Sequence, residues 1–374
     1  MAVTGIGLRR RLPPLARAFG RYLRRHPDPY VVSILALRRE VQVEIDTIIE
    51  ELLATIEASL QARVETDELA LAADATTVRF DYDTRLVLPA MLTLGRIHEL
   101  AGDVPGARLG RQVDTDLLAE GRRATTHVIR ALLDGDMRDA LNDEEYEDFH
   151  TTARPRRQAA AIAQATLQQG VEEWLDRPET PAHVADAYHH AVTLSESHQA
   201  VDTEFRTLLT RYVGTAEGSD RETLQAQLEH EYKFAEPGGG STVFEEEFHQ
   251  PYFTTQYERV GILYEDMLRM YERTLDVELG DAFLRTIVLM VVAAQIGLDD
   301  VDDFPEDRHE QLTPVTAELA MDETGGIDRI RGLVDGYLDA AQADSESHLT
   351  GMAIAYVRTS AHDRIHELRR GLGP

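Results

Sequence analysis

A run of carboxylates directly after a long apolar segment is the part of this sequence best suited to chemistry. The apolar segment covers residues 287–296, and four aspartates follow it: Asp299, Asp300, Asp302 and Asp303. Carboxylates this close repel each other unless a cation lies between them. Mg²⁺ takes one or two carboxylates and completes its shell with water and substrate phosphates. The pattern therefore predicts a Mg²⁺ site, and the alternative is a solvated acidic surface.

The same segment predicts the element that positions these side chains. Residues three and four positions apart share a helix face. One helix would therefore align Gln295 with Asp299 and with either Asp302 or Asp303. We expect a buried helix that ends in this acidic cluster.

The composition restricts the classes of function. The chain has 374 residues, 67 of them acidic and 38 basic, a net charge of −29 and no cysteine. Lys233 is the only lysine, and such acidity with almost no lysine is typical of salt-adapted, halophilic proteins. The charge argues against nucleic-acid binding, which needs a positive surface. Without cysteine the chain forms neither disulfides nor thiolate metal sites.

The N-terminal 28 residues differ from this acidic background. Seven arginines and no acid occur between Met1 and His26, with leucines and aromatic residues among them. Such a basic arm can contact an anionic membrane surface, and the alternative is a disordered or locally packed tail. We find no apolar run near the roughly 20 residues of a membrane span and no signal peptide. We therefore expect a cytoplasmic protein, with peripheral membrane contact through the arm as a further option.

Apolar residues at helical spacing dominate the remainder of the chain. The expected helices cover residues 29–64, 85–100, 108–133, 154–175, 181–212, 252–275, 327–345 and 349–372. Strand patterns are scarce. We predict an all-α fold in which residues 29–374 form a single large helical bundle around a central cavity, with an insertion at about residues 213–252.

The acidic segment resembles a known family motif. Residues 295–304, QIGLDDVDDF, are similar to the second aspartate-rich motif of trans-polyprenyl diphosphate synthases, Q-I-x-D-D-x-x-D-x-F. Without a gap, Leu298 replaces the first aspartate of that motif. With a shift of one residue, Asp299, Asp300 and Asp303 complete the D-D-x-x-D pattern, and both registers stay open.

Two further segments resemble the family in the expected order. Residues 126–136, THVIRALLDGD, are similar to the first aspartate-rich motif, but Arg130 and Ala131 replace its leading aspartate pair and only Asp134 remains. Residues 198–202, HQAVD, resemble G-Q-x-x-D and keep Gln199 and Asp202.

The phosphate-binding motifs of the family are also altered. Residues 259–264, RVGILY, resemble K-T-G-x-L-F, with Arg259 in place of the lysine; Lys233 is a competing candidate. Residues 83–89, DTRLVLP, are similar to G-K-R-L-R-P, and Arg85 stands for one of its basic residues.

The resemblance implies an isoprenoid-synthase fold and a Mg²⁺-dependent ionisation of an allylic diphosphate, followed by chain elongation or a terpene-synthase-like reaction. It assigns the catalytic metal ligands to Asp299, Asp302, Asp303 and Asp134. It assigns substrate contacts to Arg259, Arg130, Arg85, Gln199, Asp202 and Gln295. It also implies a dimer, formed with a second copy or with a complete prenyl synthase.

Three hypotheses remain open. The chain is an active prenyl-diphosphate enzyme with an altered metal site. Alternatively, it is a degenerate member of the family that serves as a partner subunit or binds prenyl lipids; the replacement of a metal ligand by Arg130 favours this second option. The third hypothesis is an unrelated acidic helical protein.

Overall fold

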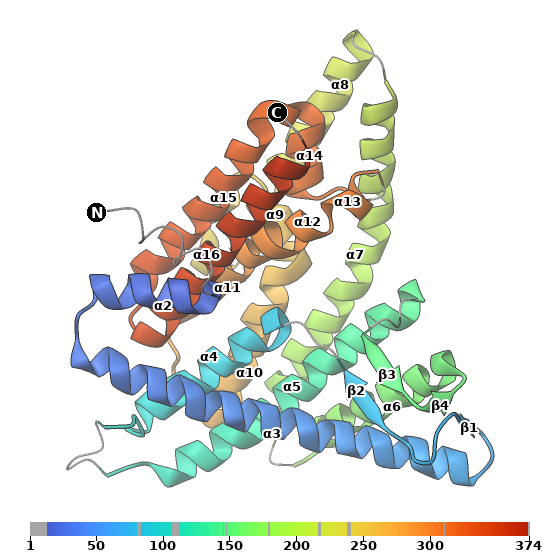
Figure 1. Ribbon diagram of the computed structural model, residues 1–374, viewed down its shortest axis with the longest axis vertical. Coiled ribbons are helices and arrows are strands. Elements are labelled where there is room, and N and C mark those ends of the chain that lie inside the picture. The colour runs from blue at the N-terminus through green and yellow to red at the C-terminus, as the bar shows by residue number, and fades with distance from the viewer. Residues whose placement is uncertain are drawn as a thin grey trace, which may run out of the picture. The chain divides into compact units, whose positions relative to one another are not determined.

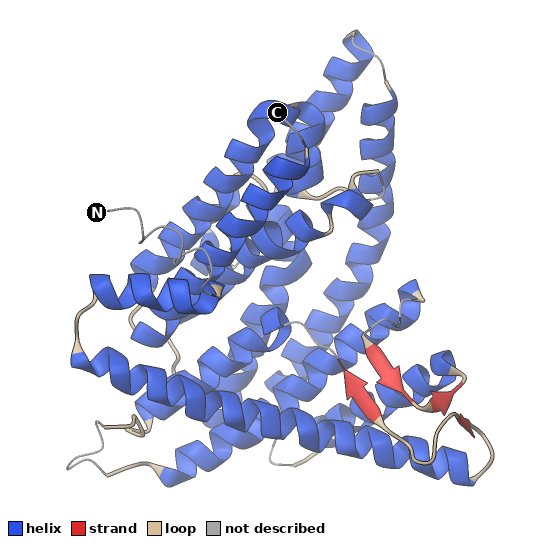
Figure 2. Cartoon of the chain, viewed as in Figure 1, coloured by secondary structure: helices blue, strands red, loops and turns tan. Residues whose placement is uncertain are grey.

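The protein is built almost entirely from helices, which confirms the predicted all-α class (Figure 1, Figure 2). The computed structural model describes residues 13–80, 84–106, 112–144, 146, 148–178, 180–215, 218–237, 241–309 and 311–372. Within these ranges, the side chains of residues 84–86, 139, 142–143 and 194–202 are not described.

The described contacts divide the chain into two compact units. Unit 1 comprises Met1–Val31, His190–Asp266 and Leu279–Pro374, and unit 2 comprises Val32–His189 and Met267–Glu278. Three long helices run from one unit into the other: α3 (Pro29–Glu65), α7 (Ala182–Gly214) and α10 (Ile262–Leu275).

Unit 1 contains the acidic segment. Apart from its parts of α3, α7 and α10, its helices in chain order are α2 (Pro14–Arg25), α8 (Ser219–Gln227), η1 (Leu228–Lys233), η2 (Thr242–Phe244), η3 (Glu247–His249), α9 (Phe253–Gln256), η4 (Tyr257–Gly261), α11 (Asp281–Ala294), η5 (Gln295–Asp299), α12 (Asp300–Asp302), α13 (Phe304–Asp307), α14 (Pro314–Met321), α15 (Glu323–Asp344) and α16 (His348–Gly371).

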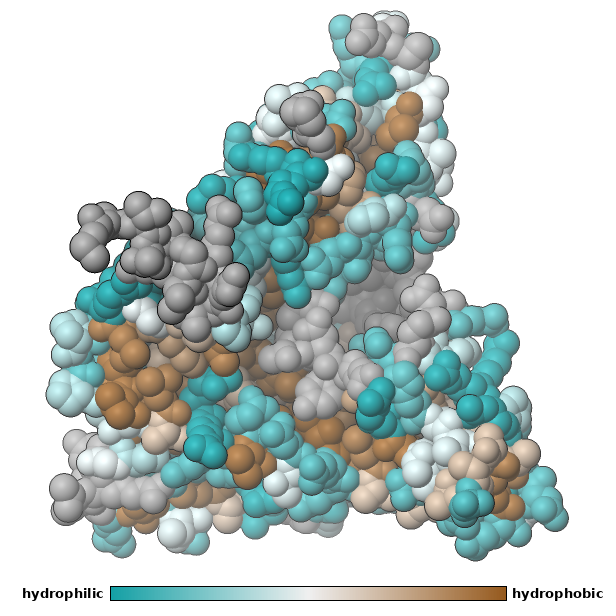
Figure 3. Space-filling view, viewed as in Figure 1, coloured by the Kyte–Doolittle hydropathy of each residue, from teal (hydrophilic) through white to brown (hydrophobic). Residues whose placement is uncertain are grey.

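Helix α11 is the core of unit 1. It packs against α15 and α16, and nearly all its side chains after Ala282 are buried. The outer face of α15 and α16 is largely hydrophilic (Figure 3). Contrary to our sequence-based expectation, the helical run Asp281–Asp302 is long and apolar enough to cross a membrane. However, 72% of its most apolar window is buried within the protein, and packing against α15 and α16 accounts for this composition.

The acidic helix end is not one regular α-helix. The segment η5, between α11 and α12, is a π-helix. Two further described segments of unit 1, η1 and η4, are also π-helices. Short π-helical segments are rare and often lie at functional sites. Gly297 allows η5 to pack closely against its neighbours, because a Cβ atom there would lie only 2.7 Å from the Cβ of Ala361.

Unit 2 consists of α-helices and two small sheets. Besides parts of α3, α7 and α10 it contains α4 (Thr84–Leu100), α5 (Thr115–Asp143) and α6 (Arg156–Leu175), with α5 packed between the other two. The strands are β1 (Ala70–Leu71), β2 (Val78–Phe80), β3 (Phe149–Thr151) and β4 (Ala153–Arg154). Antiparallel pairs form between β1 and β4 and between β2 and β3, with Ala70 opposite Arg154 and Val78 opposite Thr151.

Part of the basic N-terminal segment is a helix packed on the protein. Helix α2 begins at Pro14, a position where proline is tolerated because the first helical N–H needs no partner. It packs against α16, with an ion pair between Arg17 and Asp363 and a hydrogen bond of 2.9 Å between Tyr22 Oη and His348 Nδ1. Arg9, Arg10 and Arg11 lie outside the described residues.

The contact of Tyr22 with Gly351 makes the docking of α2 testable. A Cβ atom at Gly351 would lie 2.6 Å from Tyr22 Oη, so Gly351→Ala should force the ring away at a cost of about 1–3 kcal/mol. We expect hydrogen exchange at the amides of α2 to accelerate roughly tenfold or more. Gly371→Ala is the matched control, because no atom lies within 4 Å of that added Cβ. Equal protection of α2 in both variants would contradict the docking.

Candidate functional site

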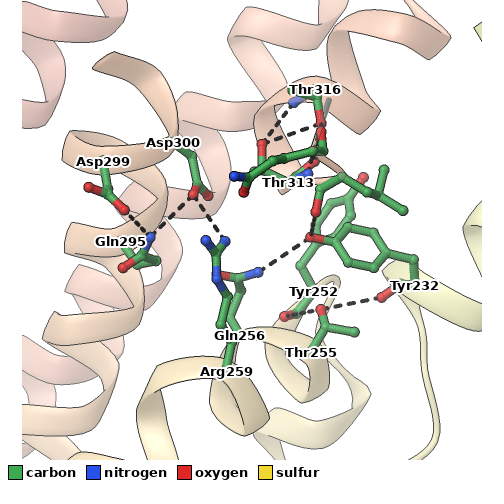
Figure 4. A network of polar contacts seen from close by, with 12 residues as sticks. Tyr232, Tyr252, Thr255, Gln256, Arg259, Gln295, Asp299, Asp300, Thr313 and Thr316 are labelled. Atoms are coloured by element: carbon green, nitrogen blue, oxygen red, sulfur yellow. Dashed lines mark hydrogen bonds and ion pairs between the residues drawn. The ribbon is translucent and has the colours of Figure 1, made fainter. Parts of the chain in front are cut away.

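The acidic end of α11 brings four of the polar residues together in unit 1. Gln295 Nε2 donates a hydrogen bond to Asp299 Oδ2 and lies 3.3 Å from Asp300 Oδ1. Arg259, from η4, approaches the same carboxylate, with 3.5 Å between its Nη1 and Asp300 Oδ1 (Figure 4). Thus Gln295 and Arg259, both predicted site residues, converge on Asp300, and Gln295 also binds the predicted ligand Asp299.

Asp300 is the most deeply buried carboxyl group of this site. Its side chain is 2% exposed, and within the described part of the chain its Oδ2 has no hydrogen-bond partner. Burial raises the pKa of Asp300 to about 7, against the opposing effect of the Arg259 guanidinium. Asp307 behaves similarly, because burial and the charge of Asp303 raise its pKa to about 6. Asp300 therefore tends to keep its proton up to about pH 7, and Asp307 up to about pH 6.

The other two aspartates of the segment are exposed and differ in their surroundings. Asp302 forms an ion pair with Arg364 of α16 at 2.9 Å. Asp303 follows Asp299 by four residues, and its N–H donates to the Asp299 carbonyl oxygen. Its charge acts on the pKa of Asp307. The described contacts thus link Asp303 with the site and Asp302 with α16.

A second polar layer lies beside Arg259. Gln256, 1% exposed, directs its Nε2 toward Tyr232 Oη at 3.5 Å. The Tyr232 hydroxyl in turn donates to the Leu312 carbonyl oxygen at 2.8 Å, just before Thr313 caps the N-terminus of α14 (Figure 4). This layer connects α9 and η1 with the start of α14.

Lys233, the competing phosphate ligand, belongs to a separate ionic centre in unit 1. Its Nζ lies 2.6 Å from Glu318 Oε1, and the same oxygen accepts a hydrogen bond of 2.8 Å from Tyr252 Oη. Arg329 pairs with the other oxygen of Glu318. Burial raises the pKa of Glu318, but these hydrogen bonds outweigh it and hold the pKa below its ordinary value. Lys233, Tyr252 and Arg329 together provide donors for both oxygens of the Glu318 carboxylate. The Lys233 amine is therefore bound to Glu318 within the protein.

Asp134 and Arg130 lie in unit 2, where each already has protein partners. Asp134 is 1% exposed and accepts hydrogen bonds from Arg138 at 2.7 Å and from Gln164 at 2.8 Å, one on each oxygen. The Tyr188 hydroxyl adds a contact of 3.3 Å. Arg130 donates to the Gly170 carbonyl oxygen at 2.9 Å. The predicted roles of Arg85, Gln199 and Asp202 fall on side chains outside the described residues.

The fit of this site to Mg²⁺ rests on few carboxylates. Among the described residues, no group of three or more histidines and acids is arranged to hold a metal ion. Mg²⁺ needs only one or two carboxylates when water and phosphate complete its shell. Asp299 and Asp303 are more exposed than Asp300 and lie one helix turn apart, so they are the carboxylates suited to bind Mg²⁺ in this way.

Sequence reasoning missed Asp307 and Gln256. Asp307 continues the four-residue spacing of Gln295, Asp299 and Asp303, so helical periodicity alone could have found it. Gln256 precedes Arg259 by one turn, but no sequence pattern distinguishes it from a surface glutamine.

The raised pKa of Asp300 predicts how stability depends on pH. Its pKa is about 7 in the folded protein and 3.8 ordinarily, so between these values the folded state keeps a proton that the unfolded chain has lost. The free energy of unfolding therefore falls as pH rises through this window. Asparagine at position 300 does not titrate, so the free energy of unfolding of Asp300→Asn should not show this decrease with pH. From pH 4 to pH 8, with a chelator present, the variant should gain on the order of 2–4 kcal/mol relative to the native protein.

Urea unfolding at each pH measures this difference. Asp186→Asn, an exposed position on α7, is the control and should stay parallel to the native protein. A pH-independent difference between Asp300→Asn and the native protein would refute the assignment.

Comparison of the chain with protein-family models, with curated proteins and with solved structures finds no match.

Proposed function

We propose that this protein is an isoprenoid-synthase-like protein that binds a prenyl diphosphate at the acidic end of α11. The observation that carries the proposal is the convergence of Gln295 and Arg259 on the buried Asp300, with Gln295 also bound to Asp299. These residues come from the two motifs, residues 259–264 and 295–304, that resemble the diphosphate-binding segments of the family. An excess of carboxylates beside one arginine suits a ligand that brings Mg²⁺ with it.

Each residue has a defined part in this proposal. Asp299 and Asp303 would hold Mg²⁺, which when bound neutralises the negative charge of a departing diphosphate. Gln295 orients the Asp299 carboxylate through its hydrogen bond. Arg259, whose Nη1 faces Asp300 and whose side chain is 29% exposed, would contact phosphate oxygens. A planar guanidinium can bind two phosphate oxygens at once, unlike a lysine.

A second candidate is a family member that binds prenyl lipids or a partner synthase without catalysis. The observation that favours it is the state of Asp134, whose oxygens are both occupied by protein donors. A carboxylate paired with Arg138 is poorly placed to bind a metal, because the arginine already supplies the compensating charge. Arg130, bound to Gly170, stands where the family motif has an aspartate.

Direct incubation with substrates tests the proposal. The protein, in high salt with Mg²⁺, is mixed with dimethylallyl, geranyl, farnesyl or geranylgeranyl diphosphate, with and without isopentenyl diphosphate. Longer prenyl diphosphates would establish chain elongation, and diphosphate release without isopentenyl diphosphate would establish a terpene-synthase-like reaction. Binding without turnover, measured by calorimetry, would support the second candidate.

Matched variants make the result specific. Asp299→Asn/Asp303→Asn should lower turnover or Mg²⁺-dependent binding at least a hundredfold, because the metal carboxylates are lost. Asp186→Asn/Glu204→Gln removes two exposed charges from α7 and should leave both unchanged. Neither turnover nor binding by a folded protein would refute the proposed function.

A further inference from the structure

His98 is a buried histidine with a carboxylate at each of its two ring nitrogens. Its Nδ1 lies 3.0 Å from Asp103 Oδ2, and its Nε2 lies 3.3 Å from Glu44 Oε1. The histidine is only 5% exposed, and the side chains of Glu44 and Asp103 are 27% and 14% exposed. All three residues belong to unit 2.

The three groups come from different segments of unit 2. Glu44 lies in the first half of α3, His98 in the last turn of α4, and Asp103 in the turn that follows α4. The Asp103 N–H also donates to the His98 carbonyl oxygen at 2.8 Å. Gly102, between them, has a φ of 75°, which glycine adopts without strain. The imidazole therefore joins α3 both to the end of α4 and to the turn after it.

This arrangement requires a protonated imidazole ring. A neutral imidazole has one N–H donor and one acceptor nitrogen, whereas an imidazolium has two donors. Because an ionised carboxylate only accepts, a neutral His98 would satisfy one neighbour and turn a lone pair toward the other. An imidazolium satisfies both, and charge-assisted hydrogen bonds of this kind are about twice as strong as neutral ones.

Other charged groups on the surrounding helices have ion pairs of their own. Helix α5 packs against α4, and a Cβ at its Gly121 would touch Ile97, the neighbour of His98. On α3, Glu40 lies one turn before Glu44 and is exposed. The ion pairs are Arg96 with Glu99 on α4 at 3.7 Å, Arg122 of α5 with Glu51 of α3 at 3.6 Å, and Arg123 with Glu120 on α5 at 3.6 Å.

The balance of burial and charge agrees with the hydrogen-bonding argument. Burial lowers the pKa of His98, but the contacts with Glu44 and Asp103 outweigh it and hold the pKa above its ordinary value of 6.5. The geometry and the electrostatics thus indicate the same state of the ring.

We propose that Glu44, His98 and Asp103 form a pH-sensitive joint that holds α3 against the end of α4. The joint is closed while the ring carries both protons. When the ring loses one proton, Asp103 keeps the remaining N–H because its contact is the shorter one, and Glu44 is left facing a lone pair. The contact between α3 and α4 then loosens. This inference does not rest on the proposed function, because none of the three residues belongs to the site in unit 1.

The direction of the pH effect follows from the raised pKa of His98. The folded protein keeps a proton that the unfolded chain loses above its ordinary pKa, so the joint contributes its full stability below pH 6.5. That contribution is lost as the pH rises through the pKa of the folded state. Glu44→Gln should weaken this dependence, because an amide can accept from a protonated ring and donate to a neutral one.

NMR titration of histidine labelled with ¹³C measures the state of the ring directly. The His98 signal is identified by its absence from His98→Gln. We expect its midpoint in the native protein above pH 6.5, and we expect Glu44→Gln and Asp103→Asn each to lower it by about one pH unit or more. Glu50→Gln, at an exposed position of α3, is the matched control and should leave it unchanged. A native midpoint at or below 6.5, or one that neither variant lowers, would overturn the proposal.

Hydrogen exchange tests whether the joint opens. Between pH 6 and pH 9, after correction for the intrinsic rate, amide protection in α3 around Glu44 should fall about tenfold more in the native protein than in Glu44→Gln, since one unit of pKa corresponds to a factor of ten. His230→Gln, which removes an exposed histidine from η1, should behave like the native protein. The same pH dependence in the native protein and in Glu44→Gln would disprove the joint, even if the ring titrates as expected.

Discussion

Replacing Glu318 with glutamine should lower the stability of the protein by about 3 kcal/mol, because removal of one partner from a buried ion pair leaves the other uncompensated. The Glu318 side chain is 1% exposed and pairs with both Lys233 and Arg329. Lys233 has only 18% of its side chain exposed, so solvent cannot fully replace the lost carboxylate. Equilibrium urea unfolding measures the change.

Asp322→Asn is the control for this prediction. Asp322 also pairs with Arg329, but at an exposed position. Its Oδ1 caps the N-terminus of α15, which asparagine does equally well. We expect only a small loss of stability. Equal losses in the two variants would show that the buried centre contributes no more than a surface ion pair.

Gly297→Ala should be the second severe change, although it adds a single methyl group. The new Cβ would lie 2.7 Å from the Cβ of Ala361 and 3.1 Å from a methyl group of Val334. Overpacking of this kind costs about 1–3 kcal/mol, more than the gain of about 1 kcal/mol that alanine brings to a helix. Because Gly297 lies inside η5, the displacement should also weaken ligand binding at Asp299.

The opposite result is expected for Gly332→Ala. Gly332 lies in α15, and a Cβ there would meet no atom within 4 Å, so this variant should be stabilised by up to about 1 kcal/mol. Thermal unfolding of both variants and titration with inorganic diphosphate and Mg²⁺ separate stability from binding. If both alanines stabilise the protein, the close packing of η5 is disproved.

The all-α class was predictable because apolar residues recur at helical spacing through most of the chain. The acidic helix end was predictable for a similar reason, since Gln295 and Asp299 are four residues apart and do form a hydrogen bond. Helix boundaries were less certain. The helix expected at residues 108–133 corresponds to α5, which covers Thr115–Asp143. It continues ten residues beyond the expected end, because these last residues are mostly polar and do not show the apolar spacing used to predict a helix.

The π-helices could not be predicted, because a shift from i+4 to i+5 hydrogen bonding has no signature in composition. An extra residue within a turn rotates every following side chain by about 100°. The sequence therefore left open which aspartates of the segment act together. In the structure Asp300 faces inward to Arg259, and Asp302 pairs with Arg364.

Long-range partners were also beyond sequence reasoning. Lys233 and Glu318 are 85 residues apart, and Asp134 and Gln164 are 30 apart. Neither pair has a spacing that suggests contact. The division into two units was not visible either, because α3, α7 and α10 cross from one unit to the other without a break in their helical pattern. Membership of the isoprenoid-synthase family stays a prediction.

The position of Lys233 gives this protein a built-in chemical reporter. It carries the only lysine amine in the chain, and that amine is engaged by Glu318 at 2.6 Å. An acylating reagent at a pH where side-chain amines react can modify Lys233 only when its contact with α14 opens. The rate of mass increase at this one residue, counted by peptide mapping, therefore measures how often η1 separates from α14, without any mutation or added dye.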